Sequence, residues 1–229
     1  MIHYHGTPIT PRSSMLGMEG RHFCVSYAYA KRCPNETPFV LNIAQSVMFD
    51  NGAFTAHTTG EPLDVVGFRD WIETYVQHPY WAVVPDVIGG DENAQRALLA
   101  QWDFPKDLSA PVWHLGLSLD WLLELSDNWP RICFGSSAEY WQIASSSWRR
   151  RMDQAFEVLS RTRRHLPWVH GMRMLGRCGD KWPLASADST NIARNYASRG
   201  ELPEVMAQRI DAIQPDRKWK PDSQLELIV

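Results

Sequence analysis

Eight short apolar runs, each ending in polar residues or glycine, set the strongest limit on how this chain can fold. The runs lie at residues 1–7, 23–28, 46–54, 81–90, 111–116, 131–137, 168–175 and 183–190. Apolar runs of this length, bounded by turn-forming residues, are typical of buried β-strands. Amphipathic helical patterns separate several of the runs and cover residues 64–78, 91–102, 118–129 and 145–165. This alternation predicts an α/β protein built on a parallel sheet.

About eight strand–helix units favour a compact, distorted (β/α)8 TIM-type barrel, with an open doubly wound sheet as the alternative. Segments 8–22 and 176–182 leave room for little helix, so we expect irregular connections there. The chain has 229 residues, 44% of them hydrophobic, which is enough for one large core. We therefore expect a single barrel domain over residues 1–215 and a C-terminal tail over residues 216–229.

Composition and cysteine spacing narrow the classes of function. The net charge of −3 gives no overall nucleic-acid signature, so any nucleic-acid surface has to be local. The four cysteines form no C-x-x-C pair, which argues against a zinc site or a disulfide framework. The sequence shows no membrane-spanning stretch and no signal-peptide pattern. We expect a cytoplasmic protein with no metal, no cofactor and no membrane partner, whose oligomeric state is open.

Polar residues gather at the C-terminal ends of six predicted strands. They are Asp50, Asn51 and Gly52, then Asp86, then His114, then Gly135, Ser136 and Ser137, then His170 and Arg173, and finally Asp188. In a parallel α/β protein these strand ends meet at one mouth, where ligands bind. A glycine such as Gly52 also allows a ligand to approach the backbone closely. We therefore predict a shared ligand site at this mouth.

Local structural roles are the alternative for several of these residues. Asp50, Asn51 and Gly52 also fit a turn, and Asp188 or Ser189 fits the N-cap of a helix over residues 190–200. Asp91 is better placed than Asp86 to cap the helix that follows, which leaves Asp86 for a ligand.

Six arginines within sixteen residues form a second candidate surface. They are Arg149, Arg150, Arg151, Arg161, Arg163 and Arg164, all on or beside one predicted helix. A solvated helix face is the ordinary interpretation. The density of arginine in an acidic protein favours a local patch that contacts the phosphates of a nucleic-acid backbone.

The candidate site resembles that of the tRNA-guanine transglycosylases. The segment FDNGAF (49–54) resembles their Asp-Ser-Gly-Gly-Phe segment, and ADSTNIARN (187–195) resembles the segment that carries their nucleophile. PDV (85–87) and FGSS (134–137) follow in the order in which that family reads the base. The resemblance covers roughly residues 46–195, and it extends to phage and bacterial relatives that insert 7-deazaguanine bases into DNA.

This resemblance implies a role for each matching residue. Asp188 would attack C1′ of the sugar, and Asp50 would be the general acid/base for the base that leaves or enters. Asp86 would accept hydrogen bonds from the base, helped by backbone groups of Gly135 and Ser136. Further implied contacts are Ser189 and Thr190 orienting Asp188, and Asn191 and Arg194 facing the substrate backbone. Two carboxylates are the chemistry that glycosidic cleavage through a covalent intermediate requires.

Departures from the family pattern shift the expected substrate. The zinc site of three cysteines and a histidine is missing, and 41 residues follow Asp188, which is too short for the usual tRNA-docking region. We therefore expect DNA rather than tRNA as the nucleic-acid partner, and a 7-deazaguanine-type base as the second substrate. The alternatives are an N-glycoside hydrolase of nucleotides or nucleosides, and a non-catalytic module that binds nucleic acid or nucleotides.

Overall fold

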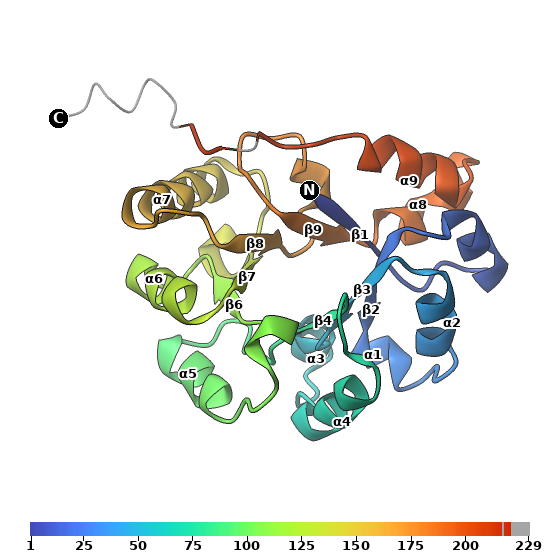
Figure 1. The fold of residues 1–229 in the computed structure, drawn as a ribbon, viewed down its shortest axis with the longest axis horizontal. Helices are drawn as coiled ribbons and strands as arrows, with labels where there is room; N and C mark the ends of the chain where they lie inside the picture. Colours follow the sequence, from blue (N-terminus) through green and yellow to red (C-terminus); the bar gives the residue numbers. More distant parts are fainter. Residues whose placement is uncertain (217, 221–229) are drawn as a thin grey trace.

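The computed structural model describes residues 1–216 and 218–220 of the chain. All strand pairs in these residues are parallel, and helices surround the strands as a ring (Figure 1). The strands are β1 (Ile2–Gly6), β2 (His22–Ser26), β3 (Ser46–Asp50), β4 (Trp81–Val83), β5 (Ser109–Ala110), β6 (Val112–His114), β7 (Arg131–Gly135), β8 (Trp168–Gly171) and β9 (Ser186–Ser189). Every predicted apolar run contributes a strand, which confirms the α/β class.

The two ends of the sheet meet in one short segment, residues 109–114. The strand order runs from β5 through β1 and β9 to β6, and only Pro111 separates β5 from β6. Val84 N donates to Ala110 O at 2.9 Å on one side, and Cys133 N donates to Pro111 O at 2.8 Å on the other. Because proline has no N–H to donate, the ladder is interrupted at Pro111. The strands thus form a distorted barrel, and the alternative of an open sheet is wrong.

The helices follow the predicted amphipathic patterns. The predicted helices correspond to α4 (Val65–Tyr75), α5 (Glu92–Ala100), α6 (Leu119–Asn128), α7 (Ser146–Thr162) and α8 (Asn191–Arg199). Four of them begin after a side chain that accepts a backbone N–H: Asp64, Asp91, Ser118 and Ser145. Asp91, not Asp86, therefore caps α5, as its position predicts.

Further helices complete the ring and were not apparent from the sequence. They are α1 (Tyr27–Ala30), α2 (Glu36–Ile43), α3 (Ala53–Thr59) and α9 (Pro203–Asp211). The connections after β1 and β8 hold only the short 3-10 helices η1 (Arg12–Met18) and η4 (Leu175–Arg177), and η2 (Lys106–Leu108) and η3 (Ala138–Tyr140) lie elsewhere. The irregularity expected at segments 8–22 and 176–182 is therefore present.

Side chains alternate between the inside of the barrel and the surrounding helices. On β3, Met48 packs inside the barrel, whereas Val47 and Phe49 pack against the helix layer. This alternation follows from the period of two in a β-strand. Most tryptophans are core residues: Trp81 lies inside the barrel and Trp113 in the layer between strands and helices.

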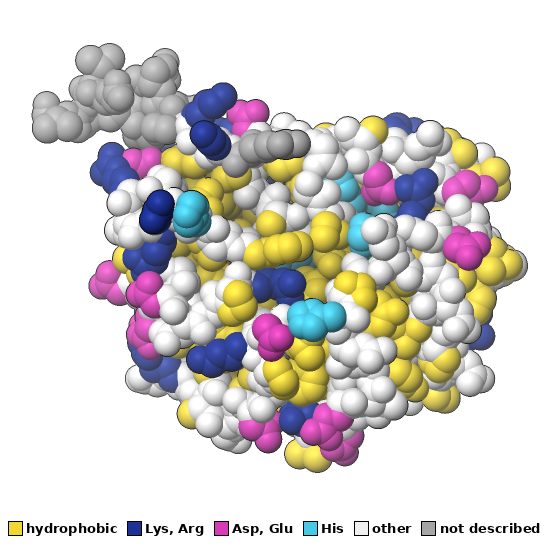
Figure 2. Space-filling view, viewed as in Figure 1, with side chains coloured by type: hydrophobic (Ala, Val, Ile, Leu, Met, Phe, Trp, Pro, Cys, Tyr) yellow, Lys and Arg dark blue, Asp and Glu magenta, His cyan; other side chains and the backbone are white. Residues whose placement is uncertain are grey.

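The surface around the barrel carries charges of both signs. Figure 2 shows hydrophobic side chains across the middle of the molecule and basic side chains beside acidic ones over the surrounding helices. No helix among the described residues is long and apolar enough to cross a membrane.

The predicted tail lies partly outside the described residues, which exclude 217 and 221–229. Within the described part, Trp219 stacks on Phe156 with ring centroids 6.0 Å apart, and its Nε1 donates to Glu157 Oε2 at 2.8 Å. Residue 219 is thus held against α7.

Candidate active site

A cavity of about 350 Å³ opens at the C-terminal ends of the strands. Its lining includes many of the polar residues singled out in the sequence: Asp50, Asn51, Asp86, His114, Gly135, Ser136, Ser137, Arg173, Asp188 and Arg194. They come from β3, β4, β6, β7, β8 and β9 and from the segments that follow these strands, so residues up to 144 positions apart in sequence (50 to 194) share one cavity. The structure brings these strand ends to a single mouth, the arrangement in which barrel enzymes bind their ligands.

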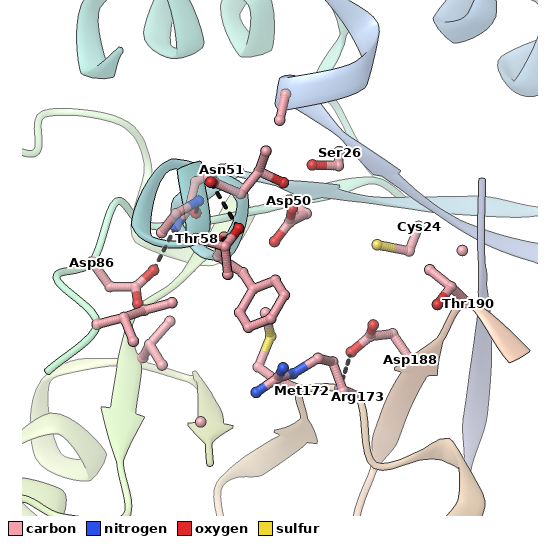
Figure 3. A pocket seen from close by; sticks show the side chains of 18 of the residues that line it. Cys24, Ser26, Asp50, Asn51, Thr58, Asp86, Met172, Arg173, Asp188 and Thr190 are labelled. Atoms are coloured by element: carbon pink, nitrogen blue, oxygen red, sulfur yellow. Dashed lines mark hydrogen bonds between the residues drawn. The ribbon is translucent and has the colours of Figure 1, made fainter. Parts of the chain in front are cut away.

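Three carboxyl groups face this cavity. Figure 3 shows Asp50 and Asp188 pointing into the same space, with Asp86 at the other end of it. Burial is the main cause that raises the pKa of Asp50 to about 6, and the negative charges of Asp188 and Asp86 raise it further. Hydrogen bonds from Ser26 and from Gly52 N act in the opposite direction. Asp50 is therefore poised to hold or release a proton near neutral pH.

Asp188 is held through one oxygen only. Its Oδ1 accepts a hydrogen bond from Arg173 N at 2.7 Å and lies 3.3 Å from His170 Nε2. No donor among the described residues contacts Oδ2, so this oxygen is open to the cavity. Arg173 has the unusual positive φ of 58°, a conformation that aims its backbone N–H at the carboxylate.

The segment after Asp188 supplies the helix cap. Thr190 is the N-cap residue of α8 and makes no side-chain capping bond, while Ser189 Oγ accepts from Asn191 N at 3.0 Å. The helix-capping alternative is thus wrong for Asp188, whose Oδ1 bonds lie elsewhere, and correct in part for Ser189.

Asp86 is fixed by two neighbours. Asn51 Nδ2 donates to its Oδ1 at 2.8 Å, and His114 Nε2 lies 2.9 Å from its Oδ2. Asn51 also donates to Val84 O and accepts from Ala53 N, so the amide orientation is determined by its own bonds. His114 Nδ1 is buried with no partner among the described residues, at the wall of the cavity. That atom is available to a polar ligand.

Gly135 gives His114 its space. A Cβ atom at position 135 would lie 3.0 Å from His114 Nδ1, closer than nearly all real Cβ contacts. Gly135, which the resemblance implies as a backbone contact for a base, therefore also leaves room for His114, which would have to shift by a few tenths of an ångström beside a larger residue. Glycine is also favoured at position 52. Its φ of 81° lies in the left-handed region that suits glycine, and an added Cβ would lie 3.1 Å from Ala28.

Four predicted site residues do not line the cavity. Gly52 faces α1, His170 lies beneath Asp188, and Ser189 and Asn191 take part in the start of α8. Strand alternation is the cause for Ser189, because Asp188 points into the barrel and its neighbour must point out. Asn191 lies on α8 and bonds to Asn195.

The rim of the cavity contains residues that the sequence did not single out. Phe54 on α3 is 46% exposed, and the guanidinium of Arg173 lies 4.3 Å from its ring centroid. Tyr29 and Arg32 on or after α1, and Thr58 on α3, also line this rim. Tyr29, Phe54 and Thr58 lie on the short helices α1 and α3, whose weak patterns concealed these positions.

The arginine-rich helix does not present six free arginines on one surface. Arg151 donates to Leu115 O and Leu117 O, and Arg163 donates to Leu123 O and pairs with Asp127. Arg161 pairs with Glu157 one turn away, and Arg149 lies 4.0 Å from Asp180.

The two groups of arginines also lie at opposite ends of α7. Arg149, Arg150 and Arg151 lie near its start, on the side of the cavity, whereas Arg161 lies in the last turn and Arg163 and Arg164 follow it. A helix rises 1.5 Å per residue, so about 18 Å separates the groups. The sequence did not reveal this separation or the backbone contacts.

Metal-binding side chains are not clustered in the part of the chain that the structure describes. No set of three or more histidine, cysteine, aspartate or glutamate side chains there is arranged to hold a metal ion. The cysteines Cys24, Cys33, Cys133 and Cys178 are free thiols.

Comparison with protein-family models, with curated proteins and with solved structures finds no match to this chain. The geometry of the cavity therefore carries the functional proposal.

Proposed function

We propose that this protein is a transglycosylase-like enzyme that cleaves the N-glycosidic bond of a guanine in nucleic acid and exchanges the base for a 7-deazaguanine. One observation carries the proposal: Asp188 offers an unbonded Oδ2 to the same space into which Asp50, with a pKa of about 6, points. One carboxylate for attack and one carboxyl for proton transfer are what base exchange through a covalent intermediate needs.

The exchange uses these two groups in sequence. Asp188 Oδ2 forms a bond to C1′ while the bond between C1′ and the base nitrogen breaks, and Asp50 donates a proton to the departing base. The sugar is then an ester of Asp188. In the second half, the incoming base loses a proton to ionised Asp50, its nitrogen bonds to C1′, and the Asp188 carboxylate leaves. Both carboxyl groups return to their starting states.

The other end of the cavity supports recognition of the base. Asp86, fixed between Asn51 and His114, is an acceptor for the N–H groups of a guanine edge. His114 Nδ1 and the backbone at Gly135 and Ser136 supply further polar contacts on the same wall. A base that has left its stack can also stack on an aromatic ring such as Phe54 at the rim.

The charge distribution supports a nucleotide as the bound unit. Asp50, Asp86 and Asp188 line the cavity, whereas the exposed arginines Arg32 and Arg194 lie where it meets solvent. An uncharged base suits the interior and anionic phosphates suit the rim. We further propose DNA as the polymer, in keeping with the resemblance to the DNA-modifying relatives.

A direct assay tests the proposal. The purified protein is incubated with guanine-containing DNA, tRNA or free nucleotides, with and without a 7-deazaguanine base, and mass spectrometry follows guanine release and base incorporation. We expect guanine release and 7-deazaguanine incorporation in DNA. Release without incorporation would identify a hydrolase, and binding without release from any substrate would identify a binding module and contradict the proposal.

The rim arginines predict a specific salt dependence. Each phosphate contact contributes roughly 0.7 to 0.9 to the slope of log affinity against log salt concentration. The double variant Arg32→Gln, Arg194→Gln should therefore lower the slope for a guanine-containing DNA by about 1.5. Arg161→Gln is the matched control, because Arg161 is 77% exposed but lies at the far end of α7. Equal slopes in the double variant and the wild type would remove the rim arginines from the phosphate site.

A further inference from the structure

A buried chain of hydrogen bonds lies beneath Asp188. Trp168 Nε1 donates to Ser186 Oγ at 3.0 Å, Ser186 Oγ lies 2.8 Å from His170 Nδ1, and His170 Nε2 lies 3.3 Å from Asp188 Oδ1. Ser186 and His170 are fully buried. This hydrogen-bond chain joins the interior of the barrel to Asp188, the carboxylate proposed above as the nucleophile.

The donor and acceptor groups of these residues determine the direction of each hydrogen bond. An indole N–H can only donate, so Ser186 Oγ accepts from Trp168. The one hydroxyl proton of Ser186 is then directed to His170 Nδ1, which must accept it through its lone pair. The ring proton of His170 is thereby on Nε2, where it is donated to Asp188 Oδ1.

The opposite tautomer is incompatible with this environment. With its proton on Nδ1, His170 would donate to Ser186 and leave the buried hydroxyl proton of Ser186 without an acceptor. Its Nε2 lone pair would also face the carboxylate oxygen of Asp188. Buried polar groups are rarely left unpaired, and two facing lone pairs repel each other.

Aromatic side chains prevent the imidazole from turning away. Tyr4 and Trp81 pack edge-to-face against His170, with ring centroids 5.9 Å and 5.2 Å away. These contacts hold the ring in the plane that aims Nε2 at Asp188.

We propose that His170 is a positioning residue for the reaction, which holds Asp188 through Oδ1 and so makes Oδ2 the oxygen that attacks C1′. This inference rests on the proposed function. Together with Arg173 N, His170 places two donors on Oδ1. These donors stabilise the carboxylate form of Asp188, which is the leaving group when the incoming base displaces it from C1′ and the C1′–Oδ2 electron pair returns to the carboxylate. Loss of the histidine donor therefore slows this second half more than the first.

The experiment compares three variants with the wild type. His170→Leu removes the donor, and His170→Gln restores an N–H near the position of Nε2. His22→Leu is the control, because His22 Nδ1 also lies 2.8 Å from a serine, Ser46 Oγ, but no described carboxylate contacts His22. Mass spectrometry follows the fraction of protein that carries the sugar–DNA adduct during turnover, and single-turnover kinetics give the rates of both halves.

We expect His170→Leu to lower the rate of the second half by about 10- to 100-fold, the usual effect of losing one hydrogen bond to a charged group, and to raise the adduct fraction. His170→Gln should recover most of this rate, and His22→Leu should behave as the wild type. If the ratio of the first-half rate to the second-half rate is the same in His170→Leu as in His22→Leu, the positioning role of His170 is overturned.

A second measurement needs neither turnover nor a variant. The 15N NMR spectrum of the wild-type imidazoles reports which nitrogen of His170 carries the proton, and we expect Nε2. A proton on Nδ1 overturns the inference even in an active enzyme. A protein that shows the Nε2 tautomer but neither releases guanine nor forms an adduct contradicts the proposed function and, with it, the role of His170 in the reaction. The hydrogen-bond chain itself would still stand.

Discussion

Replacement of Asp188, the proposed nucleophile, with asparagine is expected to abolish guanine release, with a rate loss of about 10⁴-fold or more, as for the nucleophiles of covalent enzymes. An amide oxygen is too weak a nucleophile to displace the base from C1′. The amide of the Asp188→Asn variant still offers an oxygen to Arg173 N and His170 Nε2, so the local hydrogen bonds keep an acceptor. The measurement is guanine release and adduct formation by mass spectrometry.

Asp86→Asn is the matched comparison for this variant. Asp86 is a second buried carboxylate of the same cavity, but it lies at the other end, in the part proposed to bind the base. We expect Asp86→Asn to raise KM for the nucleic acid while adduct formation continues. Thermal melting of both variants checks that the barrel is folded. Guanine release at the wild-type rate by a folded Asp188→Asn protein would remove the nucleophile assignment.

The second large effect concerns Asp50 and pH. Because the proposed base release requires the protonated form of Asp50, the single-turnover rate of release should fall about tenfold per pH unit above the pKa of about 6. Asp50→Asn should lose this dependence and lower the rate by about 10²- to 10⁴-fold. A pH–rate profile from pH 5 to 9 measures both effects, and a wild-type rate that is flat across pH 6 would contradict the role of Asp50 as the acid.

Asp50→Asn should raise the stability of the folded protein at neutral pH, although it lowers the rate of base release. The pKa of Asp50 is raised from 3.8 to about 6 in the folded state, so the folded protein binds the proton more tightly than the unfolded chain does. Stability therefore decreases as the pH rises from about 4 to about 6, and Asp50→Asn removes this loss. A shift of about two units corresponds to about 3 kcal/mol.

Urea denaturation provides the control for folding of this variant. Asp50→Asn should unfold at higher urea than the wild type at pH 7 to 8 and at similar urea near pH 4, where the folded state holds its proton on Asp50 and the unfolded chain begins to bind one. A variant that loses activity and gains stability in this way separates a catalytic role of Asp50 from a structural one.

The strand and helix periodicity of the sequence accounts for most of the fold. Apolar runs such as residues 131–137 became strands, and the stripe over 145–165 became α7, because both patterns reflect local burial. The short helices α1 and α3 were not predicted, because one or two turns carry little periodic signal. Phe54 and Tyr29 at the rim were missed for the same reason.

The arginines of α7 show where local sequence misleads. Clustering in sequence favoured one phosphate surface, yet a 17-residue helix holds its two ends far apart. Arg151 and Arg163 are also bound by backbone carbonyls of the preceding segments. Whether an arginine is free depends on which carbonyls the fold brings beside it, and sequence spacing contains no such information.

The sequence by itself determined that strands and helices alternate in an α/β fold, with a barrel favoured over an open sheet, and that Asp50, Asp86 and Asp188 lie where strands end. The sequence determines these features because the periodicity of a strand is local, and because the C-terminal ends of parallel strands meet at one edge. Only the tertiary structure decided that Asn51 and His114 clamp Asp86, and that Arg173 and His170 bind one oxygen of Asp188 and leave the other open. Hydrogen bonds depend on placement within a few tenths of an ångström, and only the packed barrel sets distances of that size between residues far apart in the chain.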